Sequence, residues 1–248
     1  MTRQVVMITG ASRGLGKAVA KAFARQGADL AICSRGNEEL LAAKTELEKL
    51  GANVLAVQAD ISISRDIERF AAEAETRYGK IDVLINNASA LGPSPMPYLL
   101  DYPKKDFQNV FRVNTEGPFL LTRRIVPGML QRRSGAVINV TSDAGQTGFS
   151  NWGAYSGSKF ALEGLSQVWA NELDGTGVTV NMVDPGEMDT EMHALAFPDY
   201  DEELALPDEA TEAFLFLASE EARHVNGQRI EAQKFSAEEA KNQWQPLL

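Results

Sequence analysis

Short apolar segments alternate with longer amphipathic segments along almost the whole chain. The apolar segments are rich in Val, Ile, Leu and Ala, and the amphipathic segments repeat their apolar positions at helical spacing. We expect strands over residues 4–9, 28–33, 53–58, 82–86, 136–141 and 178–183, with a last short strand over 228–232. We expect helices over residues 15–26, 38–50, 65–78, 107–131, 154–173 and 207–219. Apolar strands, each followed by a helix, are typical of a parallel sheet that is covered on both faces.

This alternation predicts a single domain of the α/β class. Crossovers between parallel strands are almost always right-handed, so the elements should wind into a doubly wound parallel sheet, the Rossmann fold. The length of 248 residues suits one such domain over residues 1–248, and no Pro-, Ser- or Gly-rich linker divides the sequence. Two segments lie outside the pattern. Residues 187–206 are acidic and form either a substrate lid or a solvated loop, and residues 236–248 form a C-terminal tail.

The first expected strand and helix are joined by a glycine-rich turn, TGASRGLG, at residues 9–16. A pyrophosphate at a helix N-terminus is held by backbone N–H groups, and only glycine lets the backbone approach so closely. Three glycines alone are weak grounds for a binding site, because a flexible helix start looks the same. Their position between a strand and a helix is the context that the motif requires, so the turn predicts dinucleotide binding.

The end of the second expected strand bears on the choice between NAD and NADP. An NAD-preferring domain usually has an acidic residue here for the ribose 2′-hydroxyl, whereas this chain has Cys33, Ser34 and Arg35. Arg35, with Arg13 in the glycine turn, suits a 2′-phosphate because a guanidinium donates two parallel hydrogen bonds. The alternative is that both are ordinary solvated arginines. We therefore expect NADP, as NADPH in the reducing direction, ahead of NAD.

Tyr155 and Lys159 are four residues apart on an expected helix and so share one of its faces. A free tyrosine has a pKa of about 10 and is a poor acid or base at neutral pH. A nearby ammonium group would lower that pKa. Ser142 follows the fifth expected strand, and ligands of doubly wound sheets bind beyond the strands' carboxyl ends. We therefore expect Ser142 to donate a hydrogen bond to a substrate oxygen. The alternative is a surface pair of little consequence.

Together these motifs resemble those of the short-chain dehydrogenase/reductase family in its single-domain form. The matches span nearly the whole chain in the family's order: the TGASRGLG turn, Asp60, Asn86-Asn87-Ala88, Asn114, Ser142, Tyr155, Lys159 and Pro185-Gly186-x-x-x-Thr190. The resemblance implies that Tyr155 is the general acid/base and that Lys159 lowers its pKa and holds the nicotinamide ribose. It implies that Ser142 polarises the substrate carbonyl. It also implies that Asn114 positions a water linking Lys159 to solvent.

The turn, the strand ends and the resemblance together give an expected set of dinucleotide-binding residues. Asp60 and Ile61, after the third strand, are expected at the adenine. The resemblance implies that Thr190 and the backbone near Met188 contact the nicotinamide carboxamide. The full set is Gly10, Ser12, Arg13, Gly14, Leu15, Gly16, Ser34, Arg35, Asp60, Ile61, Asn87, Ala88, Tyr155, Lys159, Pro185, Gly186, Met188 and Thr190.

Charge and composition exclude several other classes of function. The net charge of −10 and the pI near 4.8 argue against nucleic acid as a partner, because phosphate binding needs clustered Lys and Arg. Cys33 is the only cysteine, and His193 and His224 lack metal-ligand spacing, so we expect no metal and expect both histidines in surface or loop positions. No apolar run approaches the roughly 18 residues of a membrane span, and the N-terminal sequence lacks a signal peptide's apolar stretch. We therefore expect a cytoplasmic protein without a membrane partner.

The expected partner is a small-molecule carbonyl or alcohol substrate. Its pocket should include Phe149, Trp152, Met192 and Phe197, although each is more often a core or interface residue. The resemblance implies a homodimer or homotetramer that pairs through the helices of Asn114 and Tyr155. Trp244, Pro246, Leu247 and Leu248 in the tail either pack on a neighbouring subunit or form a frayed end. Residues 229–235, RIEAQKF, depart from the family's usual ending, which puts the C-terminal contacts in doubt.

Three interpretations of the function stay open. The leading one is an NADP-dependent oxidoreductase that acts on a ketone/secondary alcohol pair, with Tyr155 as the acid/base. The second is a 3-oxoacyl-carrier-protein reductase on the same scaffold, which would need a basic docking patch; Arg123-Arg124 and Arg132-Arg133 are candidates. The third is a dinucleotide-sensing binding protein without catalysis, against which the intact set of Ser142, Tyr155 and Lys159 argues.

Overall fold

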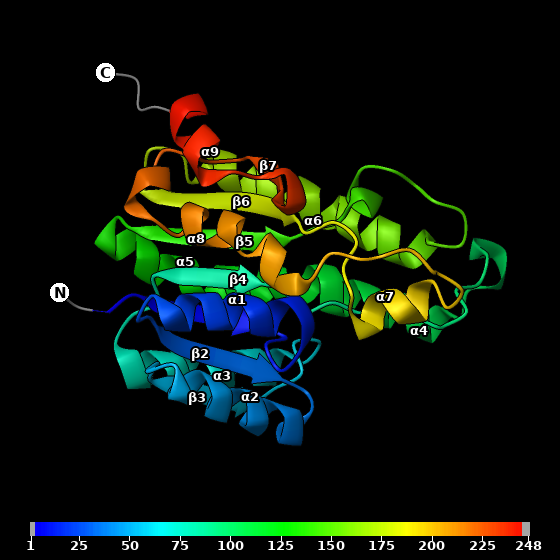
Figure 1. Ribbon diagram of the computed structural model, residues 1–248, viewed down its shortest axis with the longest axis horizontal. Helices are drawn as coiled ribbons and strands as arrows, with labels where there is room; N and C mark the ends of the chain where they lie inside the picture. Colours follow the sequence, from blue (N-terminus) through cyan, green and yellow to red (C-terminus); the bar gives the residue numbers. More distant parts are fainter. Residues whose placement is uncertain (1–2, 245–248) are drawn as a thin grey trace.

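The computed structural model describes residues 3–244, which form a seven-stranded sheet with helices on both faces (Figure 1). All neighbouring strands are parallel, in the order β3-β2-β1-β4-β5-β6-β7. The strands are β1 (Val5–Thr9), β2 (Asp29–Ser34), β3 (Val54–Gln58), β4 (Val83–Asn86), β5 (Gly135–Val140), β6 (Val178–Asp184) and β7 (Arg229–Glu231). The strand order reverses between β1 and β4, and ligands of such sheets bind beyond the carboxyl ends at this reversal.

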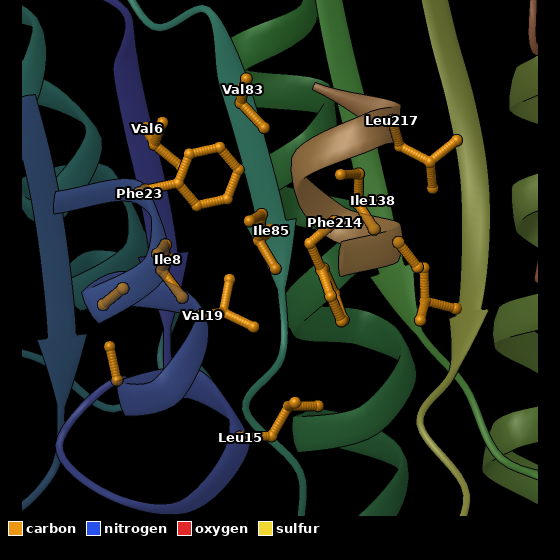
Figure 2. Close-up of a cluster of buried hydrophobic side chains, with 14 of the residues drawn as sticks. Val6, Ile8, Leu15, Val19, Phe23, Val83, Ile85, Ile138, Phe214 and Leu217 are labelled. Carbon is orange, nitrogen blue, oxygen red and sulfur yellow. The ribbon is translucent and has the colours of Figure 1, made fainter. Parts of the chain in front are cut away.

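Two apolar layers hold the helices against the sheet. Val6 and Ile8 of β1 face one layer with α1 (Gly14–Arg25), α2 (Asn37–Lys49) and α8 (Glu212–Leu217), and Figure 2 shows Phe23 and Phe214 packed there. Val5 and Met7 face the other layer, with α3 (Ser64–Tyr78), α5 (Gly117–Arg132) and α6 (Gly153–Glu172). Successive strand residues point to opposite faces, so one apolar strand serves both layers. The expected doubly wound Rossmann fold is confirmed.

The prediction of one continuous helix over residues 107–131 is wrong in detail. The segment consists of α4 (Lys104–Phe111), a wider π-turn (Arg112–Glu116) and α5. Asn114 lies in this π-turn, where the extra backbone residue displaces the side chain from the regular helical position. The helix expected over residues 207–219 is also shorter: a 3₁₀ turn (Pro207–Ala210) precedes α8, which ends at Leu217.

The C-terminal tail contains α9 (Ala237–Gln243), whose N-cap Ser236 accepts a hydrogen bond from the Glu239 amide. Trp244 stacks on Phe216 of α8, with ring centroids 6.1 Å apart, so this tail residue packs on its own chain. The contacts expected of Pro246, Leu247 and Leu248 lie outside the described residues. None of the helices within residues 3–244 is long and apolar enough to cross a lipid bilayer.

Candidate active site

The glycine turn brings backbone atoms of β1, α1 and β4 into close contact. Gly10 has a φ of 67°, and a Cβ there would lie 2.8 Å from the Ala88 Cα. A Cβ on Gly16 would collide with the Gly10 carbonyl oxygen and the Asn87 amide. Asn87 closes the turn by donating from Nδ2 to the carbonyl oxygens of Thr9 and Gly10 at 2.9 and 3.1 Å. Because the turn has no side chains at Gly10 and Gly16, a pyrophosphate could come close to its backbone N–H groups.

A cleft of about 1770 Å³ follows the carboxyl edge of the sheet. Residues after all seven strands line it, beginning with Gly10 after β1 and ending with Lys234 after β7. Every residue of the expected dinucleotide-binding set lies on its wall: Gly10, Ser12, Arg13, Gly14, Leu15, Gly16, Ser34, Arg35, Asp60, Ile61, Asn87, Ala88, Tyr155, Lys159, Pro185, Gly186, Met188 and Thr190. The fold therefore brings together residues from Gly10 to Thr190 in one cleft long enough for an extended ligand.

The two arginines expected at a 2′-phosphate differ in their surroundings. Arg35 is exposed at the end of β2, where its backbone carbonyl accepts a hydrogen bond from Gln58. The guanidinium of Arg13 forms an ion pair with Glu191 of α7 (Glu191–Ala196) and lies 3.9 Å from Glu39. Both arginines line the cleft beside Ser34, so a dianionic group there would meet two guanidinium groups.

Tyr155 and Lys159 lie in the first two turns of α6, and both are buried. The ammonium group of Lys159 lies 5.5 Å from the centre of the Tyr155 ring and donates to the Val140 carbonyl oxygen at 2.9 Å. Ser142, just after β5, donates from its hydroxyl to the Asp143 carboxylate at 2.9 Å and accepts from the Ala144 amide. Ser142, Tyr155 and Lys159 all line the cleft, so the structure brings these three expected catalytic residues together.

Asn114 does not line the cleft. Its side-chain amide donates to the Ala90 carbonyl oxygen at 2.9 Å and to the Ser158 hydroxyl at 3.0 Å, and its oxygen accepts from the Ala90 amide and the Ser89 hydroxyl. An asparagine side chain has two donor hydrogens and one acceptor oxygen with two lone pairs, so all of its capacity is used. The side chain thus holds the loop after β4 against α6, and the water that Asn114 is expected to position stays a prediction.

Burial decides the pKa values of the two ionisable groups at this site. It raises the pKa of Tyr155 to about 12, against the lowering effect of hydrogen bonds from Ser89 and Ser142. It also lowers the pKa of Lys159 to about 8, against the raising effect of the carboxylates of Asp184 and Glu163. Burial therefore outweighs the lowering that was expected from Lys159, and the net shift of the tyrosine pKa is upward. The phenol is protonated at neutral pH.

An ion cluster that the sequence analysis missed lies behind Ser142. Arg229 of β7 donates to Glu163 at 3.0 Å, to Asp184 at 2.7 Å and to the backbone carbonyl oxygen of Ser142 at 3.1 Å. Glu163 also accepts from the Thr141 hydroxyl at 2.7 Å. The sequence signal was the RIEAQKF segment, which places a charged residue on a strand next to the Asp184 strand end. The cluster connects β5, β6, β7 and α6 directly beside the catalytic residues.

The segment over residues 187–206 lies against the mouth of the cleft. Its helix α7 begins at the N-cap Thr190 and, with α4, lies beyond the carboxyl ends of the strands (Figure 1). A parallel bridge joins Met188 to Ala205 at the base of the segment. His193 is buried in it, not at the surface as expected, and its Nε2 has no hydrogen-bond partner among the described residues. The other histidine, His224, is exposed.

None of the arginines considered for docking lines the cleft. Arg124 forms ion pairs with Glu68 and Glu75 of α3, and Arg132 donates to the Ile81 carbonyl oxygen. Arg132 and Arg133 end α5 just before β5 begins, which puts them at the amino edge of the sheet, opposite the cleft. Within residues 3–244, no three His, Cys, Asp or Glu side chains gather as metal ligands would.

Comparisons with known proteins agree with this geometry. Residues 4–201 match the sequence pattern of a family described as short chain dehydrogenase. The chain is 34% identical to the 3-oxoacyl-[acyl-carrier-protein] reductase FabG of Thermotoga maritima, over 92% of this chain and 95% of that protein. A short chain dehydrogenase from Escherichia coli CFT073, solved in complex with NADPH, matches with a TM-score of 0.88 and 31% identity, over 94% of this chain and 98% of that one. Levodione reductase matches with a TM-score of 0.87 and 28% identity, over 93% and 96% of the two chains.

Proposed function

Because the chain belongs to the short-chain dehydrogenase family, we propose that it is an NADP-dependent oxidoreductase acting on a ketone/secondary alcohol pair. One observation carries the proposal. Ser142, Tyr155 and Lys159 lie in the same cleft as the glycine turn, so one extended ligand would reach from the turn to the tyrosine. A binding protein without catalysis has no need of a buried phenol and a buried ammonium group side by side.

The cofactor site fits a dinucleotide with a 2′-phosphate. Gly10 and Gly16 leave room at the turn that a side chain would fill. Arg13 and Arg35 supply the positive charge at the end of β2, where no acidic residue follows the strand directly. The related Escherichia coli structure contains NADPH. Gly14, Leu15, Asp60 and the other residues of the expected set would hold the rest of the molecule.

When bound, the nicotinamide supplies the hydride that reduces the substrate carbonyl. The chain's own residues handle the proton and the substrate oxygen. The Ser142 hydroxyl donates a hydrogen bond to that oxygen, and the Tyr155 phenol transfers its proton to it. Because the phenol is protonated at neutral pH, the protein is ready for the reducing direction. Lys159 would hold the ribose and keep positive charge beside the phenolate that remains.

A screen of carbonyl compounds with NADPH and NADH in parallel tests the proposal. We expect absorbance at 340 nm to fall with at least one ketone, and faster with NADPH. Binding of NADPH without turnover of any ketone or oxidation of any secondary alcohol would favour the dinucleotide-sensing alternative. Turnover with NADH alone would contradict the role given to Arg13 and Arg35.

The reduction of 3-oxoacyl groups on a carrier protein is the second candidate. The FabG relative from Thermotoga maritima favours it. An acidic carrier would have to dock without help from Arg123, Arg124, Arg132 or Arg133 at the cleft of the same chain. Turnover of a 3-oxoacyl carrier protein that weakens steeply with salt would support this candidate over a small ketone.

We further propose that the protein is a cytoplasmic homodimer or homotetramer. Phe160 and Val168 of α6 and Phe107 of α4 are exposed apolar side chains, which a second copy would cover. Cys33, the sole cysteine, is a buried free thiol, as suits a reducing compartment. Light scattering after size-exclusion chromatography measures the assembly, and a monomer at micromolar concentration would contradict it. Cell fractionation tests the location.

A further inference from the structure

The segment over residues 187–206 carries negative charge only. It contains no Lys or Arg, and its seven acidic residues are Glu187, Asp189, Glu191, Asp199, Asp201, Glu202 and Glu203. Only Glu191 forms an ion pair with a Lys or Arg among the described residues, namely with Arg13. Glu187 accepts from the Tyr200 hydroxyl at 3.2 Å and lies 3.9 Å from His193. The remaining carboxylates of the segment make the mouth of the cleft electronegative.

The wall of the cleft adds two carboxylates from outside this segment. Asp143, next to Ser142, and Asp106 of α4 both line the cleft, as do Glu187 and Asp189. None of these four is paired with a Lys or Arg of the described chain. The cations near this end are already engaged: Lys159 is buried against the Val140 carbonyl oxygen, and Lys234 is paired with Glu231 at 2.6 Å. Among the described residues at this end, Lys159 is therefore the one Lys or Arg without a carboxylate partner, and an anionic substrate would meet more negative than positive charge.

Aromatic rings extend from Tyr155 to the acidic segment. Trp152 lies edge-on to Tyr155 with the ring centres 5.5 Å apart, and it meets Phe197 of the acidic segment at 5.4 Å. Phe197 contacts His193 at 5.0 Å, and His193 contacts Tyr200 at 4.9 Å. Trp152 and Phe197 line the cleft. The rings come from two separate segments, so the substrate end is enclosed by aromatic side chains and carboxylates together.

This combination matches one chemical class of ligand. A desolvated ammonium group is attracted to aromatic faces, with about 0.5 to 2 kcal/mol for each favourable contact, and its charge is balanced by carboxylates. We propose that the substrate is a ketone or secondary alcohol that carries a protonated amine. The amine lies between the aromatic rings and the carboxylates of Glu187 and Asp189, and the carbonyl lies at Ser142 and Tyr155. The assignment rests on the proposed oxidoreductase function and names the class of substrate for it.

Three ketones of similar shape test the assignment: 4-(aminomethyl)acetophenone as the cation, 4-ethylacetophenone as the neutral analogue and 4-acetylbenzoate as the anion. We expect kcat/KM with NADPH to be highest for the cation and lowest for the anion, with at least about tenfold between them at low salt. Because the preference is electrostatic, it should shrink at 0.5 M salt. Benzyltrimethylammonium should inhibit competitively at concentrations where benzoate does not, which gives a readout of binding without turnover.

Two double variants, each of which removes two negative charges, show where the preference for the cation arises. Glu187→Gln with Asp189→Asn removes two carboxylates of the acidic segment that line the cleft, and Glu187 contacts the Tyr200 hydroxyl at the end of the row of rings. Glu172→Gln with Asp174→Asn removes two exposed carboxylates at the far end of α6, outside the cleft. We expect the first pair to reduce the preference for the cation over the neutral ketone at least threefold and the second pair to leave it unchanged. An unchanged preference in the first pair would overturn the placement of the amine.

The outcomes separate this assignment from the proposed function. If the wild-type protein reduces the neutral and anionic ketones as well as the cationic one, the amine assignment is wrong and the oxidoreductase function stands. If it consumes NADPH with none of the three but does so with a 3-oxoacyl carrier protein, the amine assignment is wrong and the second candidate holds. If it turns over no carbonyl compound of any kind while it binds NADPH, the proposed function itself fails.

Discussion

The guanidinium of Arg229 donates to the carboxylate of Asp184 at 2.7 Å in a part of the protein that water barely reaches. The side chains are 14% and 10% exposed, and Glu163, the other partner of Arg229, is 6% exposed. Arg229 also fixes the backbone of Ser142 through its carbonyl oxygen. Two carboxylates next to Ser142 thus form their ion pairs with one guanidinium, which comes from the last strand of the sheet.

Replacing Arg229 by Met should destabilise the protein by about 3–5 kcal/mol, because the change leaves two buried carboxylates without their cation. Chemical denaturation at pH 7 measures the loss. Combining Arg229→Met with Asp184→Asn should recover part of it, since one of the unpaired charges is removed. If the single variant were as stable as the wild type, the buried pair would not hold β7 to β6.

The sequence predicted the sheet better than the surroundings of the substrate. The strands were predictable because residues such as Val6 and Ile8 belong to runs that are apolar on both faces. The π-turn at Asn114 could not be predicted, because one extra residue in a helix leaves no periodic signal.

Arg229 was missed, because its role depends on contacts with residues far away in the chain, such as Glu163, which no local pattern contains. His193 was expected at the surface but is buried, because the rings of Phe197 and Tyr200 from its own segment pack against it.

The residues that line the cleft were predicted from motifs rather than from hydrophobic periodicity. Motif spacing and the family resemblance together named residues from Gly10 to Thr190 that the fold brings to one wall. The pKa of Tyr155 could not be predicted in the same way, because burial and neighbouring charges act in opposite directions and only the three-dimensional structure shows which is larger.

Gly16→Ala should weaken NADPH binding at least tenfold and lower the melting temperature, because the new methyl group collides with the Gly10 carbonyl oxygen and Asn87. Gly128→Ala is the matched substitution. Gly128 lies inside α5 and outside the cleft, and the nearest atom to its added methyl group is the end of the flexible Arg132 side chain at 3.4 Å, so alanine should stabilise the helix by about 0.5–1 kcal/mol. Equal behaviour of the two variants in calorimetry and cofactor titration would contradict the close-packed turn.

Tyr155→Phe should lower kcat for ketone reduction by about 10²- to 10⁴-fold, the usual contribution of a positioned general acid. The phenyl ring keeps its contact with Trp152, so NADPH affinity measured by fluorescence titration should change less than threefold. Retention of most of the wild-type turnover would show that another group donates the proton. Ser142→Ala, which keeps the phenol, should give a smaller loss.

Arg35→Asp should reverse part of the preference for NADPH over NADH, because a carboxylate repels the 2′-phosphate and accepts from a 2′-hydroxyl. Charge-assisted hydrogen bonds of about 1.5–3 kcal/mol correspond to a change of roughly 10- to 150-fold in the ratio of the two kcat/KM values. The ratio is measured with one ketone and both cofactors. Arg65→Asp makes the same charge change at an exposed position on α3, outside the cleft, and should leave the ratio within twofold of wild type. An undiminished ratio in Arg35→Asp would remove Arg35 from the 2′-phosphate site.

The titration of Lys159 should raise the free energy of unfolding as the pH rises from about 8 to 10.5. Its pKa is lowered to about 8 in the folded protein from a value of 10.5, so the unfolded chain binds more protons over this interval. One pKa unit corresponds to about 1.4 kcal/mol, which gives a gain on the order of 3 kcal/mol. Lys159→Met removes the titrating group and should lose this gain, whatever it costs to leave the Val140 carbonyl oxygen without its donor.

Urea denaturation of both proteins at intervals from pH 7 to 10.5 measures the difference between wild type and Lys159→Met. Tyr155 and Cys33, whose pKa values burial raises to about 12, lower the stability of both proteins at the alkaline end of this range. Their contribution largely cancels when the two curves are subtracted. The subtracted curve should therefore rise with pH and reflect Lys159 alone. Parallel stability curves would show that the ammonium group is no less favourable in the folded cleft than in water.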